Sequence, residues 1–388
     1  MLARPQRQVQ AARGLLRPVQ RSMSSSNVGT PSATEGVPTT LMFWTWQGER
    51  IAYYAAGPTD GRPLLLIHGF GVSGLQYRNN MDALASQGYR VYALDLLGFG
   101  RSSKPLDRTY SLDLWEMQVV DFCRFAAGTE QPWVLGGNSI GGIIAMGVAS
   151  KSCSGATKGA FGGVRGLLLF NCAAGSNNKL ILTSYRTNWL EKGFGGIVFS
   201  LVDLVLAQEA VARFGFEKLA TRDTVKSLLQ NVYVNPDRVD DELVDDILAA
   251  AADDNALGVF VKCLSGDPGT PPEKLVEKVS CPVKMIWGDR DLLTPLGVGY
   301  GFFFRALANL YPSRWSLSVI PAGHCPQDDA PDAVHSALIP WLASLPEEAA
   351  TGQKEDFDLQ QVLRLSFDAD SLERSDGIPS GVKAPDQS

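Results

Sequence analysis

Short apolar runs separated by glycine-rich and polar stretches recur along the middle of this chain. Residues 41–57 form a first pair of runs with a turn at 47–49, which predicts an antiparallel hairpin. Later runs are continuous rather than alternating, as is typical of strands buried on both faces of a parallel sheet. They lie at residues 64–67, 90–94, 133–136, 166–170, 282–287 and 317–321.

Segments with helical apolar spacing alternate with these runs, at residues 81–87, 112–127, from 142 onward and at 331–345. Strands alternating with helices predict an α/β chain with a doubly wound, mostly parallel sheet. In such sheets ligands bind at the carboxyl ends of the strands. We therefore expect functional side chains directly after the apolar runs, within core segments 36–175 and 267–345.

The pattern changes between residues 176 and 266, which contain no clear strand. Helical stretches such as 197–212, 224–231 and 240–252 occur there instead. A helical block inserted between two strands predicts a cap over the strand ends. Apolar cap residues that pack on the core would give the same pattern as residues that line a substrate channel. The candidates for the channel are Phe194, Phe199, Leu201, Leu204 and Leu206.

The two ends of the chain differ from the core in composition. Residues 1–35 are rich in arginine and serine, and their first acidic residue is Glu35. This composition is typical of an organellar transit peptide, and the apolar segment of a secretory signal is missing. A merely disordered terminus is the alternative. Residues 346–388 predict a polar C-terminal tail.

Charge and composition exclude several classes of function. A net charge of -6 on 388 residues argues against nucleic acid as the main partner. Six scattered cysteines without a C-x-x-C pair favour reduced thiols over disulfides or zinc. Three scattered histidines offer no metal-ligand spacing, and no G-x-G-x-x-G follows a strand, so we expect neither a metal nor another cofactor. The most apolar segment, 195–207, is too short to span a bilayer, which leaves at most peripheral membrane contact through the cap.

A G-x-S-x-G pattern stands between the strand at 133–136 and the helix that follows it. Its central residue is Ser139, flanked by Gly137 and Gly141. This is the nucleophile-elbow pattern, in which the serine occupies a strained turn and side chains at the glycine positions would collide with the neighbouring strand and helix. Because glycine and serine are common, an ordinary glycine-rich turn is the alternative.

A serine nucleophile needs a base, which can be sought among the histidines. His68 precedes a glycine turn and is better placed to order that loop, whereas His335 has a spacing suited to packing in the last helix. His324 follows the last strand, is preceded by Gly323, and is our candidate base.

The acid that orients the imidazole should follow the preceding strand. Asp291 clears that strand and is favoured, while Asp289 is the alternative, more suited to pairing with Arg290 or a backbone amide. Asp95 also follows a strand, but a role in stabilising its turn is the simpler account. The chain order Ser, Asp, His agrees with this assignment.

An acyl-transfer intermediate also requires two backbone donors for its oxyanion. The N–H of Ile140, next after the serine, is the first candidate. The second is the N–H of Phe70, in the loop His68-Gly69-Phe70-Gly71.

Together these motifs resemble the α/β-hydrolase superfamily over residues 41–345. They are HGFG, LDLLGFGRS, GNSIGG, WGDRDLLTP and GHCPQDD, in that order. LDLLGFGRSSKP, NCAAGSNNK and GHCPQDDAPDAVH also resemble a plant, algal and cyanobacterial group near pheophytinase and chlorophyll dephytylase. The resemblance implies a triad of Ser139, Asp291 and His324, a chloroplast location and action on phytyl esters of chlorophyll pigments. A mitochondrial location is the alternative.

The motifs together predict a serine hydrolase that acts on a hydrophobic ester. Three alternatives to this function differ in the residues that they require. Epoxide hydrolases and haloalkane dehalogenases use a carboxylate at the nucleophile position, where this chain has Ser139. His324 to Asp329 fits an H-x-x-x-x-D acyltransferase pattern, although Asp328 or Asp329 capping the helix at Pro331 is the simpler account. A receptor that keeps the fold without catalysis is the third alternative. The oligomeric state is not predicted.

Overall fold

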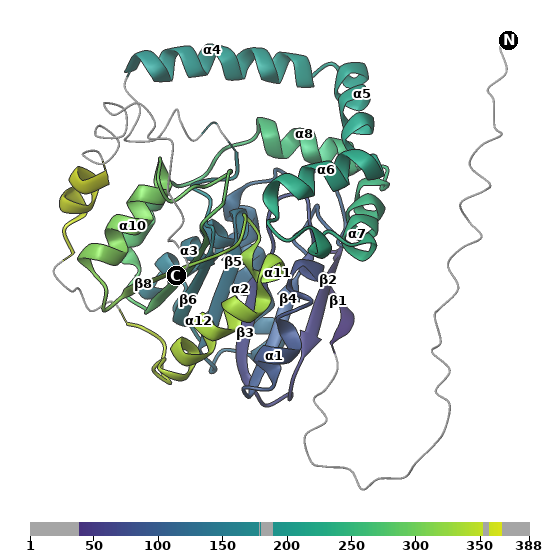
Figure 1. Cartoon of the computed structure of the whole chain (residues 1–388). Coiled ribbons are helices and arrows are strands. Elements are labelled where there is room, and N and C mark those ends of the chain that lie inside the picture. The colour runs from purple at the N-terminus through teal and green to yellow at the C-terminus, as the bar shows by residue number, and fades with distance from the viewer. Residues whose placement is uncertain (1–38, 178, 180–188, 352–356, 367–388) are drawn as a thin grey trace, which may run out of the picture. The chain divides into compact units, whose positions relative to one another are not determined.

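The computed structural model describes residues 39–177, 179, 189–351 and 357–366 (Figure 1). The expected segments at 1–35 and at the end of the tail lie outside these residues. The strands are β1 (Thr40–Trp46), β2 (Glu49–Ala56), β3 (Arg62–Ile67), β4 (Tyr89–Leu94), β5 (Trp133–Asn138), β6 (Val164–Phe170), β7 (Val283–Gly288) and β8 (Trp315–Ile320). Within the described residues they form an eight-stranded sheet in the order β1-β2-β4-β3-β5-β6-β7-β8.

Only the β1 end of the sheet is antiparallel among the described strands. β2 runs antiparallel to β1 and to β4, and every later pair, from β4–β3 to β7–β8, is parallel. The predicted hairpin closes through Gln47 and Gly48, at φ 50° and 86°. Positive φ at both central residues matches the twist of the flanking strands. The doubly wound, mostly parallel sheet predicted from the apolar runs is confirmed.

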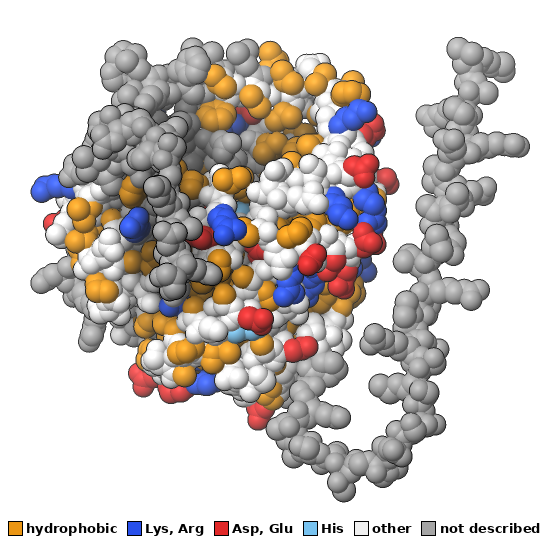
Figure 2. All heavy atoms as spheres, in the orientation of Figure 1, with side chains coloured by type: hydrophobic (Ala, Val, Ile, Leu, Met, Phe, Trp, Pro, Cys, Tyr) orange, Lys and Arg blue, Asp and Glu red, His pale blue; other side chains and the backbone are white. Residues whose placement is uncertain are grey.

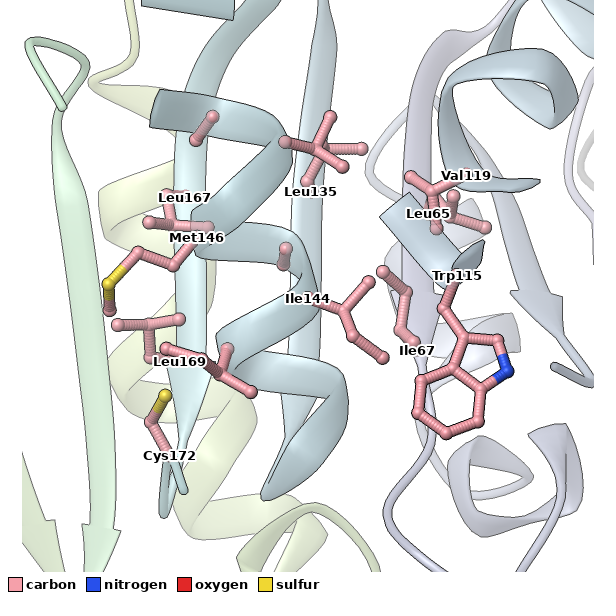
Figure 3. Packing of buried hydrophobic residues seen from close by; sticks show 14 of the residues in the cluster. Leu65, Ile67, Trp115, Val119, Leu135, Ile144, Met146, Leu167, Leu169 and Cys172 are labelled. Carbon is pink, nitrogen blue, oxygen red and sulfur yellow. The ribbon is translucent and has the colours of Figure 1, made fainter. Parts of the chain in front are cut away.

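Helices cover both faces of the sheet because successive strand residues point to opposite sides. Leu65 and Ile67 of β3 join the core under α2 (Leu112–Ala127), α3 (Ile140–Cys153) and α10 (Tyr300–Leu310). Figure 3 shows this face, with β3, β5 and β6 packed on α3 and α2. Leu64 and Leu66 join the opposite core, under α1 (Met81–Ala85) and α12 (Pro331–Ala343). Short helices η1 (Gly74–Tyr77), α9 (Pro272–Leu275), η4 (Val276–Lys278) and α11 (Pro326–Asp329) complete this part.

Between β6 and α9, helices are the only regular secondary structure among the described residues. They are α4 (Trp189–Leu206), α5 (Glu209–Leu219), α6 (Arg222–Val232), η3 (Pro236–Arg238), α7 (Asp241–Ala251) and α8 (Ala256–Ser265). Figure 1 shows α4 to α8 gathered at one end of the sheet, and we call this segment the cap. The single helix predicted at 197–212 is wrong, because Gln208 is extended and separates α4 from α5.

Apolar side chains of the first two cap helices face solvent (Figure 2). They include Val198, Val202, Leu204 and Val205 of α4, and Val211 and Phe214 of α5. In the described part of the chain, no helix combines the length and apolarity that a membrane span needs.

Part of the segment expected to be a polar tail packs on the core. Residues 359–366 are helical, and Val362 is fully buried in the core beside α10. The Phe357 ring lies 4.8 Å from that of Tyr311, whose hydroxyl accepts a 2.8 Å hydrogen bond from the Asp358 N–H. The tail is therefore polar overall, but this short segment contributes apolar contacts to the core.

Candidate active site

Ser139 occupies a strained turn between β5 and α3. Its φ is 53° and its ψ is -118°, a conformation that L-residues rarely adopt. A Cβ at Gly137 would lie 2.2 Å from the carbonyl group of Gly141, and one at Gly141 would lie 2.1 Å from the Ile67 oxygen. The glycine requirement predicted at both positions is confirmed, since helix and strand backbones leave no room for a side chain.

His324 and Asp291 form a buried pair beyond the ends of β8 and β7. The His324 Nδ1 lies 3.0 Å from each carboxylate oxygen of Asp291. Both side chains are buried. Because the carboxylate accepts from Nδ1–H, the other ring nitrogen, Nε2, is the one left to take a proton from a hydroxyl. The structure thus brings the candidate acid and base together.

The loop that carries His324 is tied to the turn that carries Ser139. The side-chain nitrogen of Asn138 donates 2.9 Å to the His324 carbonyl and 3.2 Å to the Phe170 carbonyl. Ser139 is half-buried, and its own N–H donates to the Phe170 oxygen at 3.0 Å. All three candidate residues therefore follow strands of the parallel sheet at their carboxyl ends.

Four further hydrogen bonds hold the carboxylate of Asp291. Asn171 and the Thr294 hydroxyl each donate to its Oδ2 at 2.5 Å, while the backbone N–H groups of Leu293 and Thr294 donate to Oδ1 at 2.8 and 3.2 Å. Burial by itself raises the pKa of Asp291, but the contacts with His324, Asn171 and Thr294 outweigh it and lower that pKa to about 2. The carboxylate is ionised at neutral pH and can stabilise an imidazolium.

The other histidines have structural surroundings. The Nε2 of His68 accepts the Leu96 N–H at 3.0 Å, and its Nδ1 lies 2.7 Å from the Gly69 oxygen. Burial lowers the pKa of His68 to about 4, so this ring is neutral and joins two loops. His335 is half-buried in α12.

The alternative acids also have other partners. Asp95 accepts backbone N–H groups from Gly74 and Arg101, at 2.7 and 2.8 Å, and so holds the turn that follows β4. Asp289 accepts the Ala322 N–H at 3.3 Å and lies 4.0 Å from Arg290.

The loop that contains Phe70 lies directly against the Ser139 turn. A Cβ at Gly69 would be 3.5 Å from the Cβ of Ser139. Ile140 is the first residue of α3, where a backbone N–H has no acceptor within the helix. The two N–H groups predicted to hold an oxyanion, those of Ile140 and Phe70, thus belong to segments that meet at Ser139.

Gln76 fixes this arrangement and was not identified from the sequence. Its Oε1 accepts the Gly69 N–H at 3.3 Å, and its Nε2 donates to the Asn138 oxygen at 3.3 Å. It is 1% exposed. A single glutamine outside any motif carries no signal that could have revealed this role.

An apolar cavity of about 230 Å³ lies between the Phe70 loop and the cap. A chain of aromatic rings runs along it, with centroids 5.4 Å apart for Phe70 and Phe99, 5.8 Å for Phe70 and Phe260, and 5.5 Å for Phe216 and Phe260. Its other apolar lining residues are Leu219, Ala220, Val225, Leu228, Ile247, Ala250, Ala251, Ala256 and Val259.

The residues predicted to line a channel along the first cap helix lie apart from this cavity where their side chains are described. Phe199, Leu204 and Leu206 do not line the cavity beside Phe70, and Leu204 is 60% exposed. The side chains of Phe194 and Leu201 lie outside the described part. Apolar spacing identifies a face of a helix but not the element it meets, and here α5 to α8 line the cavity.

Asp328 and Asp329 bind the cap rather than the start of α12. Asp329 accepts backbone N–H groups from Gly323, Val234 and Asn235, at 2.7, 2.9 and 2.8 Å. Asp328 accepts from Asn79 at 2.7 Å, the Tyr233 hydroxyl at 2.9 Å and Arg78 at 3.3 Å. No side chain caps α12, so the predicted capping role is wrong. The intervening turn of α11 directs both carboxylates toward the cap.

Backbone contacts bring the cap against the His324 loop itself. The His324 N–H donates to the Val232 oxygen, at the end of α6, at 2.8 Å. A Cβ at Gly323 would lie 2.1 Å from that same oxygen, so glycine before the histidine permits this close approach.

The described residues also show no metal site. Among them, no group of three or more His, Cys, Asp and Glu side chains is placed to hold a metal ion.

Known proteins resemble this chain in sequence and in fold. Lipase 3 of Moraxella sp. (strain TA144) is 25% identical over 288 residues, or 73% of this chain and 78% of the lipase. The 2-hydroxy-6-oxo-6-(2'-aminophenyl)hexa-2,4-dienoic acid hydrolase of Metapseudomonas resinovorans is 24% identical over 304 residues. These residues cover 76% of this chain and 88% of that hydrolase. The structure of a serine hydrolase involved in carbazole degradation (CarC enzyme) superposes with a TM-score of 0.56 at 20% identity, covering 79% of this chain and 99% of that one. Residues 64–337 match the model of the alpha/beta hydrolase family, and the chain belongs to that family.

Proposed function

We propose that this protein is a serine hydrolase that cleaves carboxylic esters of hydrophobic molecules. Ser139 is the nucleophile, His324 the general base and Asp291 the acid that orients the imidazole. The observation that carries the proposal is the buried Asp291–His324 pair, whose loop is hydrogen-bonded to the residue preceding a strained serine.

The geometry supports acyl transfer in two steps. The Ser139 oxygen attacks the ester carbonyl while its proton passes to Nε2 of His324, and Asp291 stabilises the imidazolium that forms. The oxyanion accepts hydrogen bonds from the N–H groups of Phe70 and Ile140, and each such donor contributes about 3–4 kcal/mol of transition-state stabilisation. His324 then protonates the departing alcohol, and water repeats the sequence to release the acid.

The surroundings of the site favour an apolar ester over other substrates. The cavity beside Phe70 is lined almost entirely by aromatic and aliphatic side chains, which solvate an acyl chain or an apolar alcohol. A serine suits an acyl-enzyme, whereas an alkyl-enzyme ester requires a carboxylate nucleophile. The lipase among the relatives agrees with an ester bond as the target.

We propose further that the esters are phytyl esters of chlorophyll pigments and that the protein acts in the plastid. The support is the resemblance of the motifs around Asp95, Ser139 and His324 to the pheophytinase group, together with the apolar cavity. The arginine-rich, acid-poor residues 1–35 have the composition of an organellar transit peptide, which agrees with a plastid location. Import of a fluorescent fusion of residues 1–35 into chloroplasts rather than mitochondria tests the location.

An acyltransferase activity has less support. The H-x-x-x-x-D pattern places its aspartate at Asp329, and all three backbone contacts of that carboxylate serve to join the His324 loop to the cap. Both oxygens of the Asp329 carboxylate accept backbone N–H groups, and the residue is 3% exposed.

The decisive experiment compares the full chain with Ser139→Ala on pheophytin, chlorophyll, and short-chain and long-chain aryl esters. We expect phytol release by the wild type and none by the variant, with labelling of Ser139 by a fluorophosphonate. Cleavage of aryl esters alone would keep the triad and remove the pigment. Absence of both cleavage and labelling would contradict the hydrolase and favour a receptor.

A further inference from the structure

Asn171 lies directly after β6, between the strand that leads to Ser139 and the strand that leads to Asp291. It is fully buried. Its N–H donates to the Ile286 oxygen at 3.3 Å, and its carbonyl oxygen lies 3.3 Å from the hydroxyl oxygen of Thr294, whose single proton is donated to Asp291. Its side-chain oxygen accepts the Gly288 N–H at 3.1 Å. The side-chain nitrogen is thereby directed at the carboxylate of Asp291, 2.5 Å away.

The chemistry of this position selects asparagine. Its φ is 40°, in the left-handed region that asparagine enters more readily than most residues. A carboxamide carries an acceptor and a donor at once. Because Gly288 offers an N–H, the oxygen must face it, and the NH₂ group must face Asp291. The orientation of the amide is thus determined by its hydrogen bonds.

The hydrogen bond from Asn171 helps to set the orientation of the Asp291 carboxylate. Asn171 and Thr294 hold Oδ2 while two backbone N–H groups hold Oδ1, so a rotation of the carboxyl group would break several bonds at once. With the carboxylate held, His324 Nδ1 is 3.0 Å from both oxygens. The direction of the imidazole therefore depends on a residue that lies 120 positions from Asp291 in the chain.

We propose that Asn171 is a positioning residue for catalysis, which holds the Asp291 carboxylate at the angle that His324 requires. This inference rests on the proposed hydrolase function. Asn171 touches neither the substrate nor Ser139 in this role and acts only through Asp291.

Two variants of the full chain separate positioning from a structural role. Asn171→Gly keeps a residue that accepts positive φ but removes the amide, and Asn171→Asp replaces the amide with a second carboxyl group. Asn309→Asp, at an exposed position of α10, introduces the same charge away from the site. The readouts are kcat and KM for a soluble aryl ester across pH, fluorophosphonate labelling, and the midpoint of unfolding.

We expect Asn171→Gly to lower kcat about tenfold or more at every pH, with KM changed less than twofold. In Asn171→Asp the two carboxyl groups share a proton at low pH, and the protonated one donates to Asp291 as the amide did. As the pH rises, that proton is lost and the two negative charges repel each other. The kcat of Asn171→Asp should therefore fall steeply over a pH range in which the wild type and Asn309→Asp keep their kcat.

A merely structural role would move the unfolding midpoint but leave the shape of the pH profile unchanged. An active wild type together with variants of unaltered kcat and profile would overturn the inference while the hydrolase stands. If Asn171→Gly does not fold, Asn171→Asp decides the matter through its profile. A wild type that neither cleaves esters nor reacts with the fluorophosphonate would instead contradict the proposed function itself.

Discussion

The side chain of Asn138 donates a hydrogen bond of 2.9 Å to the backbone carbonyl of His324. The same amide donates to the Phe170 carbonyl and accepts from Gln76, which in turn holds Gly69. One buried side chain next to the candidate nucleophile thus joins the loops of the candidate base and of the oxyanion donors. These contacts, at the carboxyl ends of the parallel strands, together set the relative positions of the three groups.

Replacing that amide should impair both stability and turnover. In Asn138→Ala the carbonyls of His324 and Phe170 lose a buried donor, which should cost about 1–3 kcal/mol of unfolding free energy. We expect kcat to fall about tenfold with KM nearly constant, because the base loop is no longer held. Urea unfolding and steady-state kinetics measure the two effects, with Asn309→Ala as a surface control. An unchanged kcat would show that other contacts suffice to hold the loop.

The elbow should tolerate no side chain at its second glycine. In Gly141→Ala the new Cβ would lie 2.1 Å from the Ile67 oxygen, a backbone atom that cannot move without disturbing β3. We expect a loss of at least about 3 kcal/mol of stability, or no soluble protein. Gly215→Ala is the matched control, since nothing lies within 4 Å of its Cβ and alanine favours the helix by about 0.5–1 kcal/mol. Equal behaviour of the two variants would refute the steric account.

Filling the apolar cavity should change chain-length preference. Ala251 of α7 lines the cavity, while its neighbour Ala252 is exposed and does not. We expect Ala251→Phe to raise KM for a long-chain aryl ester about tenfold or more and to leave a short-chain ester unaffected. Ala252→Phe should leave both unchanged. If the ratio of KM for the long-chain ester to KM for the short-chain ester were the same in both variants, the acyl chain would lie outside this cavity.

The carboxylate of Asp329 should matter for stability rather than for the choice of acceptor. Asp329→Asn exchanges one acceptor oxygen for an NH₂ group that faces backbone donors, so we expect about 1–3 kcal/mol of destabilisation. The ratio of alcohol transfer to hydrolysis, measured by product analysis in the presence of an added alcohol, should equal that of the wild type. A selective loss of transfer would revive the acyltransferase alternative.

Stability should depend on pH through Glu116 of α2. Burial raises the pKa of Glu116 from 4.5 to about 7, against the lowering contact with Lys151, which also pairs with Asp113. A raised folded-state pKa contributes stability that is complete below pH 4.5 and lost as the pH rises through 7. Relative to wild type, Glu116→Gln should therefore gain up to about 3 kcal/mol between pH 4 and pH 8. Parallel curves of unfolding free energy against pH would contradict this.

Local patterns were sufficient to predict the strands and the glycines of the elbow, and to select a candidate for the base. Continuous apolar runs identify strands buried on both faces because burial acts on each residue separately. The glycines around Ser139 are required by contacts within one turn and with the adjacent strand, so five consecutive residues carry that information. His324 could be selected because the chain has three histidines and only His324 lies in the loop directly after the last strand.

Tertiary structure alone decided which groups hold those residues and what surrounds them. Asn171 meets Asp291, and Gln76 meets Asn138, because the strand order places their loops side by side at one edge of the sheet. The same applies to the cavity lining from α5 to α8 and to the bonds that tie Asp329 to the cap. Apolar periodicity and turn chemistry act over a few residues, whereas these partners depend on packing between segments far apart in the chain. Their contacts exist only once the sheet has formed and the cap lies against it.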